Sequence, residues 1–74
     1  MIKIIGKNNC NKCVMTKNIC DEKNIPYHYI SFEDLSIINQ NYYLAFALKF
    51  NVTTLPLIIY KDKIIDLKEI DKCI

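Results

Sequence analysis

The pattern that most constrains the fold of this chain lies at its N-terminal end. A short β-branched apolar run over residues 2–5 ends at Gly6, the only glycine, and indicates a buried strand. Residues 11–23 carry apolar side chains at helical spacing, and residues 27–30 again have strand character. A strand, a helix and a second strand within about thirty residues predict a βαβ unit with a right-handed crossover.

The helix over residues 11–23 is predicted from four side chains that would share its apolar face: Val14, Thr16, Ile19 and Cys20. Asn24 follows, and asparagine tolerates the left-handed conformation in which many helices end. Pro26 disfavours a helical conformation for the residue before it, so we expect the helix to end there.

A second helix is predicted to begin at Ser31 or a neighbour, with Glu33 and Asp34 near its positive N-terminal end. Apolar side chains recur at mostly helical intervals through residues 35–48. Asn51 lies where this helix would end in the left-handed conformation.

The remaining residues predict two strands and a closing helix. Residues 57–60 have the character of a third strand, residues 61–63 fit a hairpin turn, and residues 64–65 begin a fourth strand. Three residues at helical spacing indicate the short closing helix: Leu67, Ile70 and Ile74. The order β-α-β-α-β-β-α predicts an α/β fold in a single domain over residues 1–74, with a four-stranded mixed sheet flanked by helices.

Composition and charge limit the classes of function. The net charge is +2, all ten basic residues are lysine, and acidic neighbours accompany them, so we expect a solvated surface and no nucleic-acid binding. The apolar runs are too short to span a membrane, and the N-terminus shows no export signal. We therefore expect a cytoplasmic monomer that does not bind membranes.

The four cysteines are unevenly spaced, which favours redox chemistry or metal binding by a close pair over a disulfide framework. Cys10 and Cys13 lie where a loop enters the first helix, and unpaired backbone N–H groups there lower the pKa of a thiol. Lys7 and Lys12 flank the pair and add positive charge. We expect Cys10 to attack a disulfide as a thiolate and Cys13 to resolve the mixed disulfide.

The chain resembles the glutaredoxin family in two elements that lie far apart in the sequence: Lys7-x-x-Cys10-x-x-Cys13 and Thr54-Leu55-Pro56. The resemblance covers nearly the whole chain and implies a thioredoxin fold and thiol–disulfide exchange. It implies that Pro56 follows a cis peptide bond and faces the cysteines. It also implies that the backbone of Leu55 pairs with an incoming peptide or glutathione, with Thr54 in the same substrate-contacting neighbourhood.

Residues 64–69 depart from the family pattern, which commonly has a Gly-Gly pair and then an aspartate that hold the γ-glutamyl end of glutathione. Both glycines are missing, Asp66 is the candidate substitute for the acidic group, and Lys68 or Glu69 stands in its position. The resemblance implies glutathione or disulfide-containing proteins as partners, glutathione as co-substrate, and no bound cofactor. It leaves open a related class, the NrdH redoxins, which donate electrons to ribonucleotide reductase and are reset by thioredoxin reductase.

Two alternatives give the cysteine pair a different chemistry. Heavy-metal-associated domains of this size carry Cys-x-x-Cys between a strand and a helix, which suits Cu(I) or Zn(II). Such domains usually have Met where this chain has Asn8, and they need two strands between their helices, where only residues 27–30 are available. A glutathione-ligated iron–sulfur cluster in a dimer would need the missing glycines. We therefore expect no metal site.

The remaining candidate residues are expected to be structural. Cys20 is predicted to be a small buried hydrophobe, Cys73 an exposed spare thiol, and His28 a surface residue of the second strand. Three aromatic residues are expected to pack along the second helix with some exposed surface: Tyr42, Tyr43 and Phe46.

Overall fold

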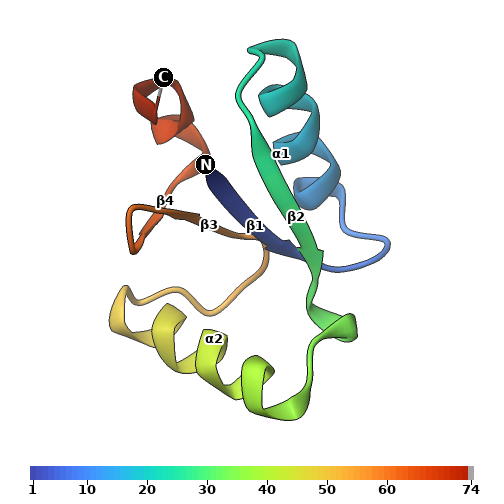
Figure 1. The fold of residues 1–74 in the computed structure, drawn as a ribbon, viewed down its shortest axis with the longest axis vertical. Helices are drawn as coiled ribbons and strands as arrows, with labels where there is room; N and C mark the ends of the chain where they lie inside the picture. Colours follow the sequence, from blue (N-terminus) through green and yellow to red (C-terminus); the bar gives the residue numbers. More distant parts are fainter. Residues whose placement is uncertain (74) are drawn as a thin grey trace.

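The computed structural model describes residues 1–73, with side chains through Ile70, and Figure 1 shows how its elements are arranged. The elements follow in this order: β1 (Ile2–Gly6), α1 (Asn11–Glu22), β2 (Tyr27–Ser31), the 3-10 turn η1 (Phe32–Asp34), α2 (Ile37–Lys49), β3 (Leu57–Tyr60), β4 (Lys63–Ile65) and the 3-10 helix η2 (Leu67–Cys73). The predicted order is confirmed, with an additional turn before α2 and a 3-10 helix at the end.

The four strands form one mixed sheet in the order β2-β1-β3-β4. β1 pairs with β2 in parallel and with β3 antiparallel, and β3 pairs antiparallel with β4. Ile4 in β1 lies opposite Tyr29 on one side and Ile58 on the other. The strand from the N-terminus is therefore an inner strand of the sheet, with a partner on each side.

The helices cover both faces of the sheet, with α1 and η2 on one face and α2 on the other (Figure 1). Alternate side chains of β1 divide between these faces, since Ile4 belongs to the core under α1 and η2, and Ile5 to the core under α2. We call these two sides the α1 face and the α2 face. The predicted flanking of the sheet by helices is confirmed.

The buried side of α1 differs from the predicted one. Cys13, Thr16 and Cys20 are buried, whereas Val14 is 50% exposed. The buried residues follow one another at intervals of three and four, and Val14 is rotated by about 100° from Cys13. The prediction for Val14 was wrong. A threonine and two cysteines face the sheet instead, although valine is the more hydrophobic residue.

The start of α2 also differs from the prediction. Ser31 ends β2, and Ser36 caps α2, because the Ser36 hydroxyl accepts a hydrogen bond from the Asn39 N–H at 3.2 Å. The side-chain amide of Gln40 donates to the carbonyls of Phe32 and Leu35 at 3.1 and 3.2 Å. These bonds satisfy the carbonyls of the separate turn, so Glu33 and Asp34 lie outside α2.

The predicted left-handed residues after the two helices are confirmed, and the predicted hairpin turn is one residue shorter than expected. Asn24 and Asn51 both adopt left-handed backbone conformations, with φ of 56° and 58°. Lys61 and Asp62 have φ of 50° and 62° and form the two-residue connection between β3 and β4, so β4 begins one residue earlier than predicted, at Lys63. The loop that precedes β3 contains a cis peptide bond between Leu55 and Pro56.

The C-terminal helix packs on the α1 face through Ile70, which is fully buried. The predicted contribution of Ile74 and the exposure of the Cys73 side chain lie outside the residues whose side chains are described. Between residues 1 and 73, no helix has both the length and the apolar character that a membrane span requires.

Candidate active site

The loop between β1 and α1 places Cys10 at the N-terminus of the helix. Asn9 in this loop has φ of 58°, and the Asn8 N–H donates to the carboxylate of Glu33 at 3.4 Å. Cys10 has an extended backbone and acts as the N-cap residue, with its carbonyl accepting the first helical hydrogen bond, from Val14, at 3.1 Å. The Cys10 side chain therefore points at the free N–H groups of the first turn.

The environment of Cys10 favours its thiolate. Its sulfur accepts a hydrogen bond from the Cys13 N–H at 3.3 Å. The pKa of Cys10 is lowered, first by the side-chain hydrogen bond with Cys13, then by the backbone N–H groups of Cys13 and Lys12 and by the charge of Lys7, against an opposing effect of burial. Cys10 is partly exposed, so a substrate can reach this sulfur.

Cys13 has the opposite environment. Its side chain is 1% exposed on the buried side of α1. Burial raises the pKa of Cys13, and the hydrogen bond and the negative charge of Cys10 raise it further, against the opposing effects of the Lys7 backbone N–H and the Lys7 charge. The two thiols of one motif thus differ in exposure and in acidity, in the directions predicted for an attacking and a resolving cysteine.

A groove of about 530 Å³ lies beside the pair, between the first turns of α1 and the loop that carries the cis peptide bond. Its lining comes from α1, the loop before β3, the hairpin and the start of η2: Lys12, Met15, Thr16, Val52, Thr54, Leu55, Pro56, Ile58, Ile64, Ile65, Asp66, Leu67 and Glu69. Residues from three separate segments of the chain, 12–16, 52–58 and 64–69, are thus brought together on one surface.

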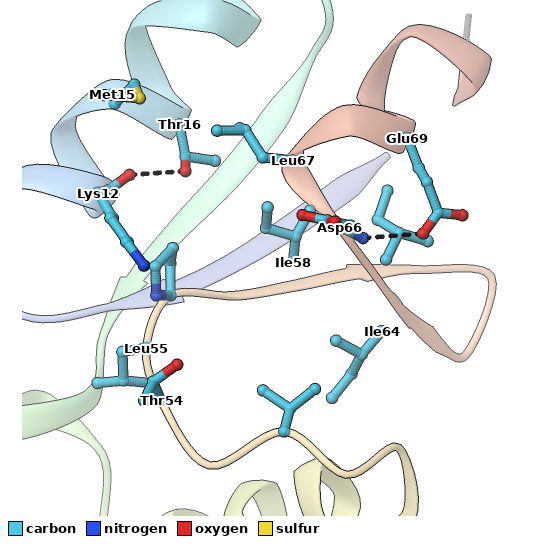
Figure 2. Close-up of a pocket in the computed structure, with 13 residues that line it drawn as sticks. Lys12, Met15, Thr16, Thr54, Leu55, Ile58, Ile64, Asp66, Leu67 and Glu69 are labelled. Atoms are coloured by element: carbon cyan, nitrogen blue, oxygen red, sulfur yellow. Dashed lines mark hydrogen bonds between the residues drawn. The ribbon is translucent and has the colours of Figure 1, made fainter.

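The charges in this groove are separated. Lys12 extends from α1 on one side, and Asp66 and Glu69 lie on the other, beyond the apolar floor (Figure 2). The Glu69 carboxylate accepts a hydrogen bond from the Asp66 N–H at 3.1 Å, which holds the two acidic residues together at the start of η2. Lys68 is exposed and is not among the lining residues, so Asp66 and Glu69 carry the acidic charge here.

Most of the site residues predicted from the sequence meet in this region. Lys12, Thr54, Leu55, Pro56 and Asp66 line the groove. Lys7 does not line it; this exposed residue acts on Cys10 through its charge, and on Cys13 through its backbone N–H and its charge.

Sequence reasoning missed the part that Gly6 and Tyr29 play at this site. A Cβ on Gly6 would lie 2.5 Å from the Tyr29 hydroxyl and 2.9 Å from the Cys13 sulfur, so only glycine leaves room for both. Tyr29 comes from β2, and its ring packs against the core of the α1 face. The sequence held one signal for this contact. Side chains alternate between the faces of a strand, and in a parallel pair of β1 and β2 this alternation places Tyr29 on the same face as Gly6.

Thr16 was assigned only to the apolar side of α1, but it lies at the base of the groove. Its hydroxyl donates to the Lys12 carbonyl at 2.7 Å, which satisfies a buried polar group within the first turns of the helix. Among the described residues, no group of three or more His, Cys, Asp or Glu side chains is arranged to hold a metal ion.

Solved structures with a similar fold include a glutaredoxin (Grx-1) from Archaeoglobus fulgidus, with a TM-score of 0.73 and 12% sequence identity over 97% of this chain and 83% of that one. A mutant of the thioredoxin-like protein BC3987 is similar with a TM-score of 0.75 and 12% identity, over 99% of this chain and 97% of that one. These similarities confirm the predicted thioredoxin fold.

Comparison with curated proteins finds no match. The glutaredoxin family model matches residues 2–65, a range that includes Cys10, Cys13 and Pro56 and stops just before Asp66. Because this match covers most of the chain and the predicted resemblance rests on the same residues, the chain belongs to the glutaredoxin family.

Proposed function

We propose that this chain is a dithiol thiol–disulfide oxidoreductase in which Cys10 is the nucleophile and Cys13 the resolving thiol. The observation that carries the proposal is the opposite environment of the two sulfurs. One is partly exposed with a lowered pKa, and the other is buried with a raised pKa. Membership of the glutaredoxin family supports a thiol redox function.

The proposed reaction has two exchange steps. The Cys10 thiolate attacks one sulfur of a substrate disulfide, a Cys10–substrate disulfide forms, and the other substrate sulfur leaves as a thiolate that takes up a proton. Cys13 then loses its proton and attacks the Cys10 sulfur, which releases the second substrate thiolate and forms a Cys10–Cys13 disulfide. The substrate gains two electrons and the protein loses two, so a second thiol reductant must reset the pair.

The groove supports a small peptide disulfide as substrate, with glutathione as co-substrate. Glutathione carries carboxylates and an amine at separated positions, and the groove offers Lys12 on one side with Asp66 and Glu69 on the other. Ile64 and Ile65 line the groove where the family commonly has glycines. Their side chains leave less room for glutathione to approach the backbone of these two residues. Disulfide-containing proteins, including ribonucleotide reductase, are the alternative partners.

The assignment of roles is tested by three variants assayed on the same substrates. Cys10→Ser should abolish reduction of both a glutathione mixed disulfide and a protein disulfide. Cys13→Ser should keep the first activity and lose the second, because only the protein disulfide needs resolution within the chain. Cys20→Ala is the matched control, since Cys20 is fully buried in the core of the α1 face and far along the helix from the pair, and it should keep both activities. Full activity of Cys10→Ser would refute the proposal.

The reductant is tested by comparing two reducing systems. Turnover with glutathione and glutathione reductase, but not with thioredoxin reductase, would support a true glutaredoxin. The reverse result would assign the chain to the NrdH type and remove glutathione as co-substrate. Stoichiometric binding of Cu(I) without any thiol exchange would instead support a soft-metal carrier and contradict the proposed activity.

A further inference from the structure

Tyr29 lies beside the resolving cysteine and is not among the residues that line the groove. In the register of β1 and β2, Tyr29 pairs with Ile4, and its side chain extends along the α1 face towards the end of β1. The Tyr29 hydroxyl and the Cys13 sulfur both lie within 3 Å of the point where a Cβ on Gly6 would be. The phenol and the buried thiol are therefore neighbours under the end of the strand.

The hydroxyl of Tyr29 has only a weak partner in this state. It donates to the Lys7 carbonyl at 3.4 Å, which is longer than the 2.5–3.0 Å usual for a hydroxyl donor. A phenolic hydrogen rotates about its C–O bond and can reach a different acceptor with little cost. The Lys17 ammonium, 4.2 Å from the centre of the Tyr29 ring, holds the ring in place while the hydrogen turns.

The resolving step creates a stronger acceptor for this hydroxyl than the Lys7 carbonyl. Cys13 must become a thiolate before it attacks Cys10, and it must do so with a side chain that is 1% exposed. A buried thiolate is costly because the charged form has lost its contact with water, and the backbone N–H of Lys7 offsets only part of that cost, since the pKa of Cys13 stays raised. Burial and the negative charges of Cys13, Cys10 and Glu33 raise the pKa of Tyr29, which keeps the phenol protonated and able to donate at the pH of exchange.

We propose that the Tyr29 hydroxyl turns from the Lys7 carbonyl to the Cys13 sulfur in the resolving step and stabilises the buried thiolate by a hydrogen bond. Tyr29 keeps its own proton throughout. The proton of Cys13 goes to the departing substrate thiolate or to water, and the Cys13 electron pair forms the bond to Cys10. The inference rests on the proposed dithiol function and gives that function a third residue.

The test separates the two exchange steps in the full chain. In single-turnover experiments with a protein disulfide, Tyr29→Phe should slow the decay of the Cys10 mixed disulfide about tenfold and move its pH midpoint upward. The variant keeps the ring and the contact with Lys17, and its unfolding free energy is measured in parallel to confirm that it folds. In a Cys13→Ser background, where no resolving step occurs, Tyr29→Phe should leave the attack of Cys10 unchanged.

Tyr27→Phe is the matched control, since Tyr27 lies two residues earlier in β2 and packs against the same core away from the cysteine pair. This control should resolve the mixed disulfide at the unmodified rate. An unchanged rate and pH midpoint in folded Tyr29→Phe would overturn the inference and leave the proposed function intact. A chain that never forms a Cys10–Cys13 disulfide would instead reject the proposed function itself.

Discussion

The two faces of the sheet are built very differently. On the α1 face, six buried residues from β1, α1, β3, η2 and the loop after α1 form one cluster: Ile2, Ile4, Cys20, Ile25, Ile58 and Ile70. Among the side chains that the structure describes, only Ile5, Ala47 and Leu57 are buried on the α2 face. Of the residues in α2 itself, only Ala47 is buried, while Ile38 is 80% exposed and Leu48 is 62% exposed.

This difference in packing means that the position of the Cys13 sulfur depends on the α1 face and not on α2. Gly6, Cys13 and Tyr29 all lie on the densely packed α1 face, where a small displacement of Gly6 or Tyr29 would move the Cys13 sulfur. The loop with Thr54 and Leu55 lies between the groove beside the cysteine pair and a second, apolar hollow of about 270 Å³ against α2. We therefore expect stability and thiol geometry to depend on the α1 face, and α2 to tolerate substitution.

The largest loss of stability is expected from Ile70→Ala. Ile70 is fully buried in η2 against the α1 face, and removing its side chain leaves a cavity that costs about 3 kcal/mol of unfolding free energy. Urea denaturation measures this loss. A loss below about 1 kcal/mol would contradict the view that the α1 face is the tightly packed side of the sheet, because a cavity there would then have little effect on stability.

Gly6→Ala should follow with a loss of about 2 kcal/mol, since overpacking strains the groups around it. The added Cβ would lie 2.8 Å from Cε2 of Tyr29 and 2.9 Å from the Cys13 sulfur. The same variant should slow thiol exchange, measured with a protein disulfide. Lys7→Ala, an exposed change next to it, serves as the control for stability only and should change the unfolding free energy by less than about 0.5 kcal/mol.

The pH dependence of alkylation sharpens the contrast between the exposed and the buried ends of the motif. Because the pKa of Cys10 is lowered, its thiolate persists at a pH where an ordinary thiol is protonated. The alkylation rate of Cys10 should therefore fall only as the pH drops through that lowered pKa. The raised pKa of Cys13 keeps it a thiol over the same range. With iodoacetamide at pH 7, Cys10 should be alkylated more than about tenfold faster than Cys13, which corresponds to a difference of ~1.4 kcal/mol in activation free energy.

The Cys10→Ser variant is the control for this measurement and should show only the slow reaction. A midpoint for Cys10 at or above the pKa of an ordinary thiol would contradict the assigned environment.

Ser36→Ala should cost about 1 kcal/mol by removing the cap of α2. Ser36→Asn keeps a capping side chain and should restore most of that stability. Amide exchange at residues 37–39 should accelerate in the alanine variant, while exchange in β1 should change little. Equal acceleration in both elements would show that the α2 face is coupled to the α1 face more tightly than its packing indicates.

The smallest effect is expected from Ile38→Ala, which makes the same chemical change as Ile70→Ala on the opposite face. Ile38 is 80% exposed, and alanine is the better helix former, so unfolding free energy should change by less than about 0.5 kcal/mol. Urea denaturation of the two variants side by side gives the comparison directly. A loss of unfolding free energy for Ile38→Ala similar to that for Ile70→Ala would refute the proposed difference between the two faces.

Predictions that depend on local backbone chemistry were confirmed, and those that depend on packing were not always right. Asn24 and Asn51 end their helices as predicted, because asparagine tolerates left-handed conformations without help from the rest of the fold. Ser31 and Ser36 are both good caps, and the choice between them depended on Gln40 reaching back to the turn. Val14 was expected on the buried side, but the side of α1 that faces the sheet is decided by contacts with the strands.

The amino-acid sequence by itself determined the order of the elements and the position of Cys10 and Cys13 at the start of a helix. Both follow from residues close together in the chain, where turn residues and apolar periodicity act directly on the backbone. Only the tertiary structure decided that Tyr29 meets Cys13 under Gly6, and that Lys12 faces Asp66 across a groove. These residues are distant in sequence and become neighbours only when the strands pair and the helices pack, so the site beyond the cysteine pair is a property of the assembled sheet.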